Sequence, residues 1–248
     1  MSTHFHYVVT DVFGFLPDFR REFHRMLAQC TKAFRGWPEE VLNKAPTGEH
    51  EPVTAEALVT QMAYAIANPS EAGAVRYSKD WPGAKTLVSD IGSRIVRTPR
   101  PDYHLDADNE DWPEVAELPI DMPDLLIEEY GSVEAAREAI AREVHRLEQE
   151  ARRKLEAEGS KFAGVRRVLR TPHTKRATSV EEFGARNPTF AAAGDLEAAR
   201  RAIRVRRAFN AAYDEALAKW TAGDRSAVFP AGTWWMRVHH GVVCRPPP

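Results

Sequence analysis

Two histidines near the start of the chain, His4 and His6, stand two residues apart, a spacing that suits a shared metal ion. Residues 4–12 are rich in aromatic and β-branched side chains, a composition that predicts a β-strand. Alternate residues of a strand share one face and lie about 7 Å apart along it, so both imidazoles would approach one divalent cation. The alternative interpretation is a pair of histidines close to a chain terminus that bind no metal.

Tyr64 and Asn68 form a second pair of residues whose side chains could take part in a reaction. The sequence predicts a helix from a Thr54 cap to about Ala67, ended by Asn68 and Pro69. The four-residue spacing places the phenol and the carboxamide on one helix face. A tyrosine attacks a phosphate that a metal polarises, and asparagine offers a neutral oxygen ligand. The alternative is that Tyr64 packs in the core and Asn68 caps the helix.

These residues stand in two stretches that closely resemble the motifs of single-tyrosine HUH transposases, in particular the REP-associated tyrosine transposase group. Residues 1–9 read MSTHFHYVV, which is similar to the strand that carries the family's two histidines. Residues 62–75 read MAYAIANPSEAGAV, which is similar to the helix end that carries its nucleophile. The departures are Thr3, where the family usually has Asn, and Ser70, where it usually has Val. Neither position supplies a metal ligand or the nucleophile in the family.

The resemblance implies a metal-dependent DNA-strand transferase. His4 and His6 would bind Mg²⁺ or Mn²⁺, and Asn68 would complete the ligand set. Tyr64 would attack a phosphate of single-stranded, hairpin-forming DNA and leave a 5′-phosphotyrosine and a free 3′-hydroxyl. The reverse attack would rejoin strands, the chemistry of DNA transposition.

The resemblance also implies a fold, an α+β chain with a partial ferredoxin-like HUH antiparallel sheet and a mainly helical C-terminal extension. In the family, further strands precede the histidine strand, so the resemblance implies an N-terminally truncated catalytic domain. Residues 228–244 are similar to the tail of a long-form subset. The expected division is a catalytic domain over 1–98, an acidic linker or arm over 99–130, and the extension over 131–248.

Other elements follow from periodicity and capping. A helix is predicted to begin at an Asp18 N-cap, to bury an apolar face that includes Phe19, Phe34 and Cys30, and to end at Gly36. Longer helices are predicted from Ser132 to about Glu158 and from Leu196 to Thr221. Residues 228–238 predict a turn and then a strand. On that strand, His239 and His240 would point to opposite faces, and of Trp234 and Trp235 one would be a core anchor and the other a surface anchor.

The net charge of −2 conceals an uneven distribution. Residues 102–129 hold eleven acids and no Lys or Arg, whereas residues 160–210 hold twelve Lys or Arg against four acids. A basic block of this kind favours contact with a polyanion. The side chains predicted to bind DNA are Arg166, Arg167, Arg170, Lys175, Arg176, Arg200, Arg201 and Arg204.

The composition, with 43% hydrophobic and 28% charged residues, is that of a globular chain. The sequence shows no apolar run that would span a bilayer and no leader pattern, and its two cysteines are too few for a disulfide framework. We therefore expect a cytoplasmic, nucleoid-associated protein with no membrane partner, which could form a homodimer.

Two alternative functions stay open at this point. The chain could be a catalytically inactive remnant that binds DNA phosphates with these basic side chains, together with Arg206 and Arg207. It could also be a helical interaction protein without a DNA role, in which the acidic arm neutralises the basic block.

Overall fold

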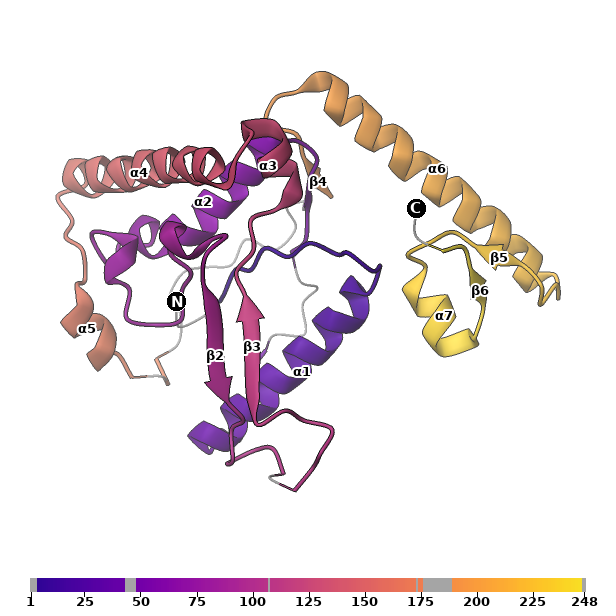
Figure 1. Ribbon diagram of the computed structural model, residues 1–248, viewed down its shortest axis with the longest axis horizontal. Helices are drawn as coiled ribbons and strands as arrows, with labels where there is room; N and C mark the ends of the chain where they lie inside the picture. Colours follow the sequence, from indigo (N-terminus) through magenta and orange to yellow (C-terminus); the bar gives the residue numbers. More distant parts are fainter. Residues whose placement is uncertain (1–3, 43–47, 107, 173, 176–188, 247–248) are drawn as a thin grey trace. The chain divides into compact units, whose positions relative to one another are not determined.

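The computed structural model describes residues 4–42, 48–106, 108–172, 174–175 and 189–246 (Figure 1). Helices and short strands both occur, which confirms the predicted α+β class. The elements gather into two units that alternate along the chain. Unit 1 holds Met1–Val9, Gly48–Thr98 and Ala116–Asp195, and unit 2 holds Thr10–Thr47, Pro99–Val115 and Leu196–Pro248. Within the described ranges, every helix is too short or too polar to cross a lipid bilayer.

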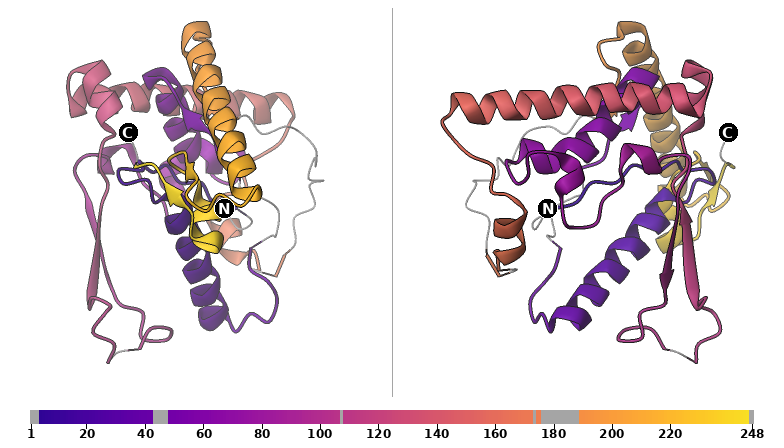
Figure 2. Two further views of the ribbon diagram at one scale, coloured as in Figure 1. Left: turned by 90° about the vertical axis from the view of Figure 1, so that its right-hand side faces the viewer. Right: turned by 60° about the vertical axis from the view of Figure 1, so that its left-hand side comes forward.

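The core of unit 1 lies between the helices α2 (Ala55–Glu71), α3 (Asp124–Tyr130) and α4 (Val133–Ala157). Figures 1 and 2 show α4 lying across α2. Both long helices begin at their predicted caps: the Thr54 hydroxyl accepts a hydrogen bond from the Ala57 N–H at 3.2 Å, and Ser132 accepts one from Ala135 at 3.1 Å. Apolar side chains at helical spacing fill the interface, among them Leu58, Met62, Leu126, Ile140 and Leu147.

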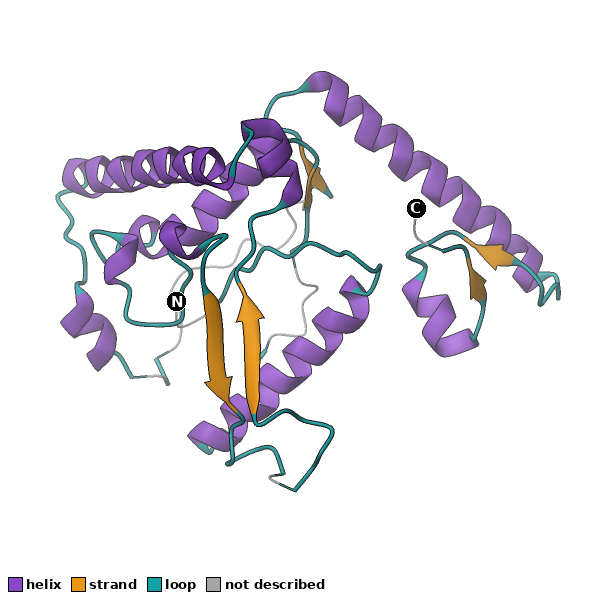
Figure 3. Ribbon diagram, in the orientation of Figure 1, coloured by secondary structure: helices purple, strands orange, loops and turns teal. Residues whose placement is uncertain are grey.

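Unit 1 also contains short strands, drawn as arrows in Figure 3. Strands β2 (Ile95–Pro99) and β3 (Val115–Pro119) pair in opposite directions, and Arg97 Nε lies 2.6 Å from Glu117 Oε1 across them. Strand β1 (Glu51–Pro52) pairs in parallel with β4 (Phe190–Ala191). The remaining elements are the 3₁₀ turns Ser78–Asp80 and Val88–Asp90 and the helix α5 (Val165–Arg170).

The structure divides the chain differently from the predicted segments 1–98, 99–130 and 131–248. Met122 and Leu126, which fall in the predicted linker, are buried in the core of unit 1 at 5% and 0% exposure. Helix α2 precedes residue 98 and α4 follows residue 130, yet their apolar faces complete one core. A boundary at residue 98 would expose both faces to water, which disfavours it.

Helix α2 was predicted to stop before Pro69, but it continues to Glu71. The conformational bias against a helical Asn68 is overcome because the last turn is buried and hydrogen-bonded. The Ala72 N–H donates to the Asn68 carbonyl at 3.0 Å, and the Ala74 N–H donates to the Pro69 carbonyl at 3.0 Å. Ser70 is fully buried, and its hydroxyl lies 3.2 Å from that of Ser78.

A buried carboxylate, Glu148 on α4, holds this region in place. It is 8% exposed, accepts a hydrogen bond from the Ser78 N–H at 2.7 Å, and lies 3.7 Å from the Arg152 guanidinium. Ser78 in turn contacts Ser70 at the end of α2. Glu148 therefore links α4 to the last turn of the helix that carries Tyr64 and Asn68.

A Glu148→Ala variant is expected to lose about 1–3 kcal/mol of unfolding free energy, because the buried Ser78 N–H is left without an acceptor. Urea unfolding monitored by circular dichroism measures this loss. The matched control is Glu150→Ala on the same helix, where Arg146 Nη1 lies 2.5 Å from an exposed carboxylate, and a change within about 1 kcal/mol is expected. Equal losses of unfolding free energy in the two variants would contradict the stabilising role of the buried Glu148 carboxylate.

Unit 2 packs α6 (Leu196–Thr221) against the C-terminal segment. Its core is centred on Phe229, which is fully buried, and includes Ala216 of α6 and Met236. The segment forms β5 (Val228–Phe229), α7 (Trp234–His240) and β6 (Val243–Cys244), with β5 and β6 paired in parallel. A turn and then a strand were predicted over residues 228–238. The chain does turn at Gly232 (φ 82°), but the predicted strand is wrong, because the residues after the turn form α7 and Met236 packs in the core.

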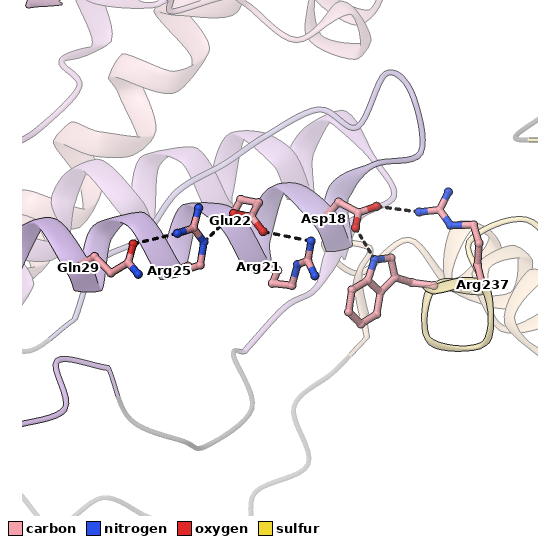
Figure 4. A network of polar contacts seen from close by, with 7 residues as sticks. Asp18, Arg21, Glu22, Arg25, Gln29 and Arg237 are labelled. Atoms are coloured by element: carbon pink, nitrogen blue, oxygen red, sulfur yellow. Dashed lines mark hydrogen bonds and ion pairs between the residues drawn. The ribbon is translucent and has the colours of Figure 1, made fainter. Parts of the chain in front are cut away.

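Helix α1 (Leu16–Arg35) begins earlier than predicted, and Asp18 is not its N-cap. Instead the Asp11 carboxylate accepts hydrogen bonds from the N–H groups of Phe15 and Leu16 at 2.9 and 3.1 Å. Asp18 lies in the first turn and accepts hydrogen bonds from the Trp234 indole and the Arg237 guanidinium, both at 2.7 Å (Figure 4).

The apolar face of α1 is not buried, contrary to prediction: no residue of this helix is buried, and Phe34 is 65% exposed. Cys30 is half-buried on that face. Gly36 ends the helix in the left-handed conformation (φ 59°), as predicted.

Candidate functional site

The segment that carries His4 and His6 is not a strand, although a strand over 4–12 is predicted. Residues 4–11 have no regular secondary structure. A strand is held by hydrogen bonds to a neighbouring strand, and within the described part of the chain no strand pairs with this segment. The aliphatic side chains Val8 and Val9 are consequently 42% and 43% exposed.

The structure nevertheless brings both histidines and Tyr64 together. The ring centroids of His4 and His6 are 5.1 Å apart at an interplanar angle of 85°, and those of His6 and Tyr64 are 5.2 Å apart at 76°. All three belong to unit 1 and all are exposed to solvent. Two separate segments of the sequence thus contribute adjacent imidazole and phenol groups to one open surface.

Tyr64 lies on the side of α2 that faces away from the core. Its neighbours in sequence and one turn on, Ala63 and Ala67, are fully buried, whereas Tyr64 is 40% exposed. The alternative interpretation of Tyr64 as a core residue is therefore wrong. Its side chain is therefore partly open to solvent.

Asn68 follows one helical turn after Tyr64 but is buried, with 6% exposure. It is not the predicted alternative, a helix C-cap, because the helix continues to a cap at Ala72. Its side-chain Oδ1 is buried and accepts no hydrogen bond from any described residue. Leaving such an oxygen unpaired costs about 1–3 kcal/mol, so it is an unusual acceptor in the described part of the chain.

The donor atoms fit a divalent cation in part. Metal–imidazole bonds measure about 2.0–2.1 Å, so rings with centroids 5.1 Å apart are within reach of one ion. Mg²⁺ prefers an all-oxygen shell, and two imidazoles therefore favour Mn²⁺ of the two predicted ions. Across the described residues, no group of three or more His, Cys, Asp or Glu side chains is placed to hold a metal. The predicted set has two such residues, His4 and His6, and relies on Asn68 for the third ligand.

The electrostatic surroundings favour the neutral imidazole at His6. Partial burial of the ring lowers its pKa from the ordinary value, and the adjacent His4 lowers it further. A neutral imidazole is the form that donates a lone pair to a metal.

Two further polar side chains, Gln61 on α2 and its contact His50, were not predicted from the sequence. His50 Nε2 lies 2.9 Å from Gln61 Oε1, and Gln61 precedes Tyr64 by three residues on α2. The helical spacing of Gln61 and Tyr64 is a signal that would have found the glutamine. His50 lies outside the helix, and no periodicity in the sequence indicates it.

The predicted DNA-binding side chains fall in both units. Arg166, Arg167 and Arg170 are exposed on α5 and at its end, and Lys175 is exposed in unit 1. Arg176 lies outside the described residues. Arg200, Arg201 and Arg204 are exposed on α6 in unit 2, as are Arg206 and Arg207.

The arginines of α6 are ordered along the helix. Arg200, Arg204 and Arg207 follow the i, i+4, i+7 spacing that aligns side chains on one face. At a rise of about 1.5 Å per residue, the three span roughly 10 Å. We call these three residues the α6 basic stripe.

Comparison of this chain with protein families, with characterised proteins and with solved structures found no match. A function for the chain is therefore inferred from the geometry of its own residues.

Proposed function

We propose that the protein is a metal-dependent DNA-strand transferase that cleaves and rejoins single-stranded DNA through Tyr64. The observation that carries the proposal is the proximity of the His4, His6 and Tyr64 rings, which come from separate segments and meet on an exposed surface. The buried, unpaired Oδ1 of Asn68 one turn away adds an oxygen without a partner in the described chain.

The proposed step is a transesterification at phosphorus. The Tyr64 Oη attacks the scissile phosphate and gives up its proton, while the bond from phosphorus to the 3′ oxygen breaks and that oxygen takes up a proton. The products are a 5′-phosphate ester of Tyr64 and a free 3′-hydroxyl. Because one phosphoester replaces another, the reverse attack by a 3′-hydroxyl rejoins DNA without external energy.

His4, His6 and the side-chain oxygen of Asn68 are the residues proposed to hold Mn²⁺ or Mg²⁺. When bound, the ion supplies Lewis-acid polarisation of the phosphate. A partial ferredoxin-like sheet remains part of the proposal, but segment 4–11, which has no regular secondary structure, is not one of its strands. Exposed arginines of α5 and α6 are proposed to contact DNA phosphates, which implies association with the nucleoid.

The test is the formation of a covalent protein–DNA adduct. Hairpin oligonucleotides with randomised single-stranded flanks are incubated with the full chain and Mn²⁺, Mg²⁺ or EDTA and analysed on a denaturing gel. The fragment 3′ of the cut stays on the protein, so a 3′-end label is expected to shift to the protein band with Mn²⁺ and not with EDTA. A 5′-end label on the same oligonucleotides is expected to yield a free, shortened strand.

Two other outcomes contradict the proposal in different ways. Salt-sensitive retention of the hairpin without an adduct would identify a DNA-binding remnant, because phosphate contacts weaken as salt rises. The absence of retention at low salt would leave the interpretation as a helical interaction protein.

A further inference from the structure

A hollow of about 410 Å³ in unit 2 is lined by aromatic side chains. This volume falls within the range of small-molecule sites, about 300–1,000 Å³. Helix α6 and the segment that begins α7 form its walls. The lining residues are Phe209, Asn210, Tyr213, Asp214, Gly232, Thr233, Trp234 and Trp235.

The aromatic walls are held in place by contacts outside the hollow. The Trp234 indole N–H donates to Asp18 at 2.7 Å, which fixes the ring on α1. Tyr213 packs edge-on against the buried Phe229 ring, with centroids 5.6 Å apart. Trp235, by contrast, is 60% exposed, which fits the predicted surface anchor. The centroid of its ring lies 3.9 Å from that of the His239 ring. The hollow therefore offers a preformed aromatic surface with one accessible indole.

Polar atoms accompany the aromatic rings. The Thr233 hydroxyl oxygen is buried and has no hydrogen-bond partner among the described residues, and Thr233 as a whole is 6% exposed. A buried hydroxyl without a partner is unusual and costs stability, so it marks a place for a ligand atom. Asn210 and Asp214 stand exposed on α6 at the rim.

The charges around the hollow select the class of ligand. Arg206 lies on the same helix with its guanidinium 5.8 Å from the Phe209 ring, and Arg200, Arg201, Arg204 and Arg207 are exposed on the turns before it. Asp214 is the single carboxylate of the lining. The lining itself holds no Lys or Arg, and the surplus of positive charge lies along the rest of α6, which favours an aromatic group attached to an anionic chain.

We propose that this hollow binds an unstacked base of single-stranded DNA, with exposed arginines of α6 on the phosphates. Base stacking on an aromatic side chain tolerates any sequence, while Asn and Asp can read base edges: Asn pairs with adenine, and Asp accepts from the cytosine amino group. The choice of DNA as ligand rests on the proposed function, but the hollow belongs to unit 2 and the Tyr64 site to unit 1.

The experiment measures binding in a Tyr64→Phe background, so that cleavage cannot interfere. Fluorescence anisotropy compares a base-bearing oligodeoxynucleotide with an abasic oligomer of the same length and charge. Trp235→Ala is expected to weaken binding of the base-bearing strand roughly 5- to 150-fold and to leave the abasic oligomer unchanged. Arg204→Ala is expected to weaken binding of both oligomers. It should also reduce the slope of log affinity against log salt concentration by about one.

The matched control is Trp112→Ala, which removes another exposed tryptophan of unit 2, 42% exposed and outside the hollow, and is expected to change neither affinity. Equal effects of Trp235→Ala on both oligomers would overturn the base site, as would tight binding of a trimethyl-lysine peptide in place of DNA. An adduct formed by the parent chain alongside either result would leave the proposed function standing. Base-selective binding without any adduct would support the hollow and contradict the transferase.

Discussion

A Tyr64→Phe variant is expected to form no covalent adduct with single-stranded DNA, a loss of more than about 10³-fold that reflects removal of the nucleophile. The substitution deletes only the phenolic oxygen and keeps the ring that packs against His6 at 5.2 Å. Because Tyr64 is 40% exposed, the fold should be preserved. The readout is the protein band that carries the 3′-end label, with circular dichroism and non-covalent DNA affinity expected to match the parent.

Tyr77→Phe is the matched control for this loss. Tyr77 belongs to the same unit and is 38% exposed, but its ring is packed by the Arg152 and Lys79 side chains rather than by a histidine. We expect it to form the adduct at the parental level. An adduct that persists in Tyr64→Phe, or disappears in Tyr77→Phe, would move the nucleophile away from Tyr64.

An Ile140→Ala variant is expected to lose about 2–5 kcal/mol of unfolding free energy. Ile140 is fully buried on α4 and belongs to the core that α4 forms with α2 and α3. Truncation removes apolar contacts and leaves a cavity that the surrounding helices fill only in part. Urea unfolding followed by far-ultraviolet circular dichroism measures the loss.

The conservative variant Ile140→Val serves as the control and is expected to cost about 0.5–1.5 kcal/mol. The larger truncation should also reduce the yield of the Tyr64 adduct, because the same core orients α2. A loss below about 0.5 kcal/mol for Ile140→Ala, that of a surface substitution, would contradict the packing of α4 on α2.

The long helices could be predicted because their signals are local. Ser132 caps α4 as expected, and α6 runs over the predicted Leu196–Thr221. In both cases a cap or a breaking glycine is combined with apolar residues at helical spacing. Such information is complete within the segment itself and needs no knowledge of its neighbours.

The errors arise where distant residues decide the conformation. Residues 4–12 have the composition of a strand, but a strand forms only when another pairs with it. Asp18 is of a residue type that favours a helix N-cap, yet its carboxylate accepts hydrogen bonds from Trp234 and Arg237 near the other end of the chain. Pro69 sits inside α2 because burial of Ser70 outweighs a local preference.

The candidate site could be predicted in its members but not in its geometry. The spacing of His4 and His6 and their resemblance to known motifs selected residues that the structure brings beside Tyr64. The burial of Asn68 and the proximity of His50 to Gln61 depend on tertiary packing, which sequence spacing does not encode. The aromatic hollow was missed for the same reason, since the tail that forms it was expected to be a strand.

The hydrogen bond from Trp234 to Asp18 has a consequence for synthesis on the ribosome. It joins residues 216 positions apart, and a ribosome that adds about 5–20 residues per second needs roughly 10–40 s to make the chain between them. During this time, α1 has emerged without the partners that α7 supplies. Its Asp18 carboxylate lacks both of these donors until the end of synthesis, so the first long helix to be made is among the last to be secured.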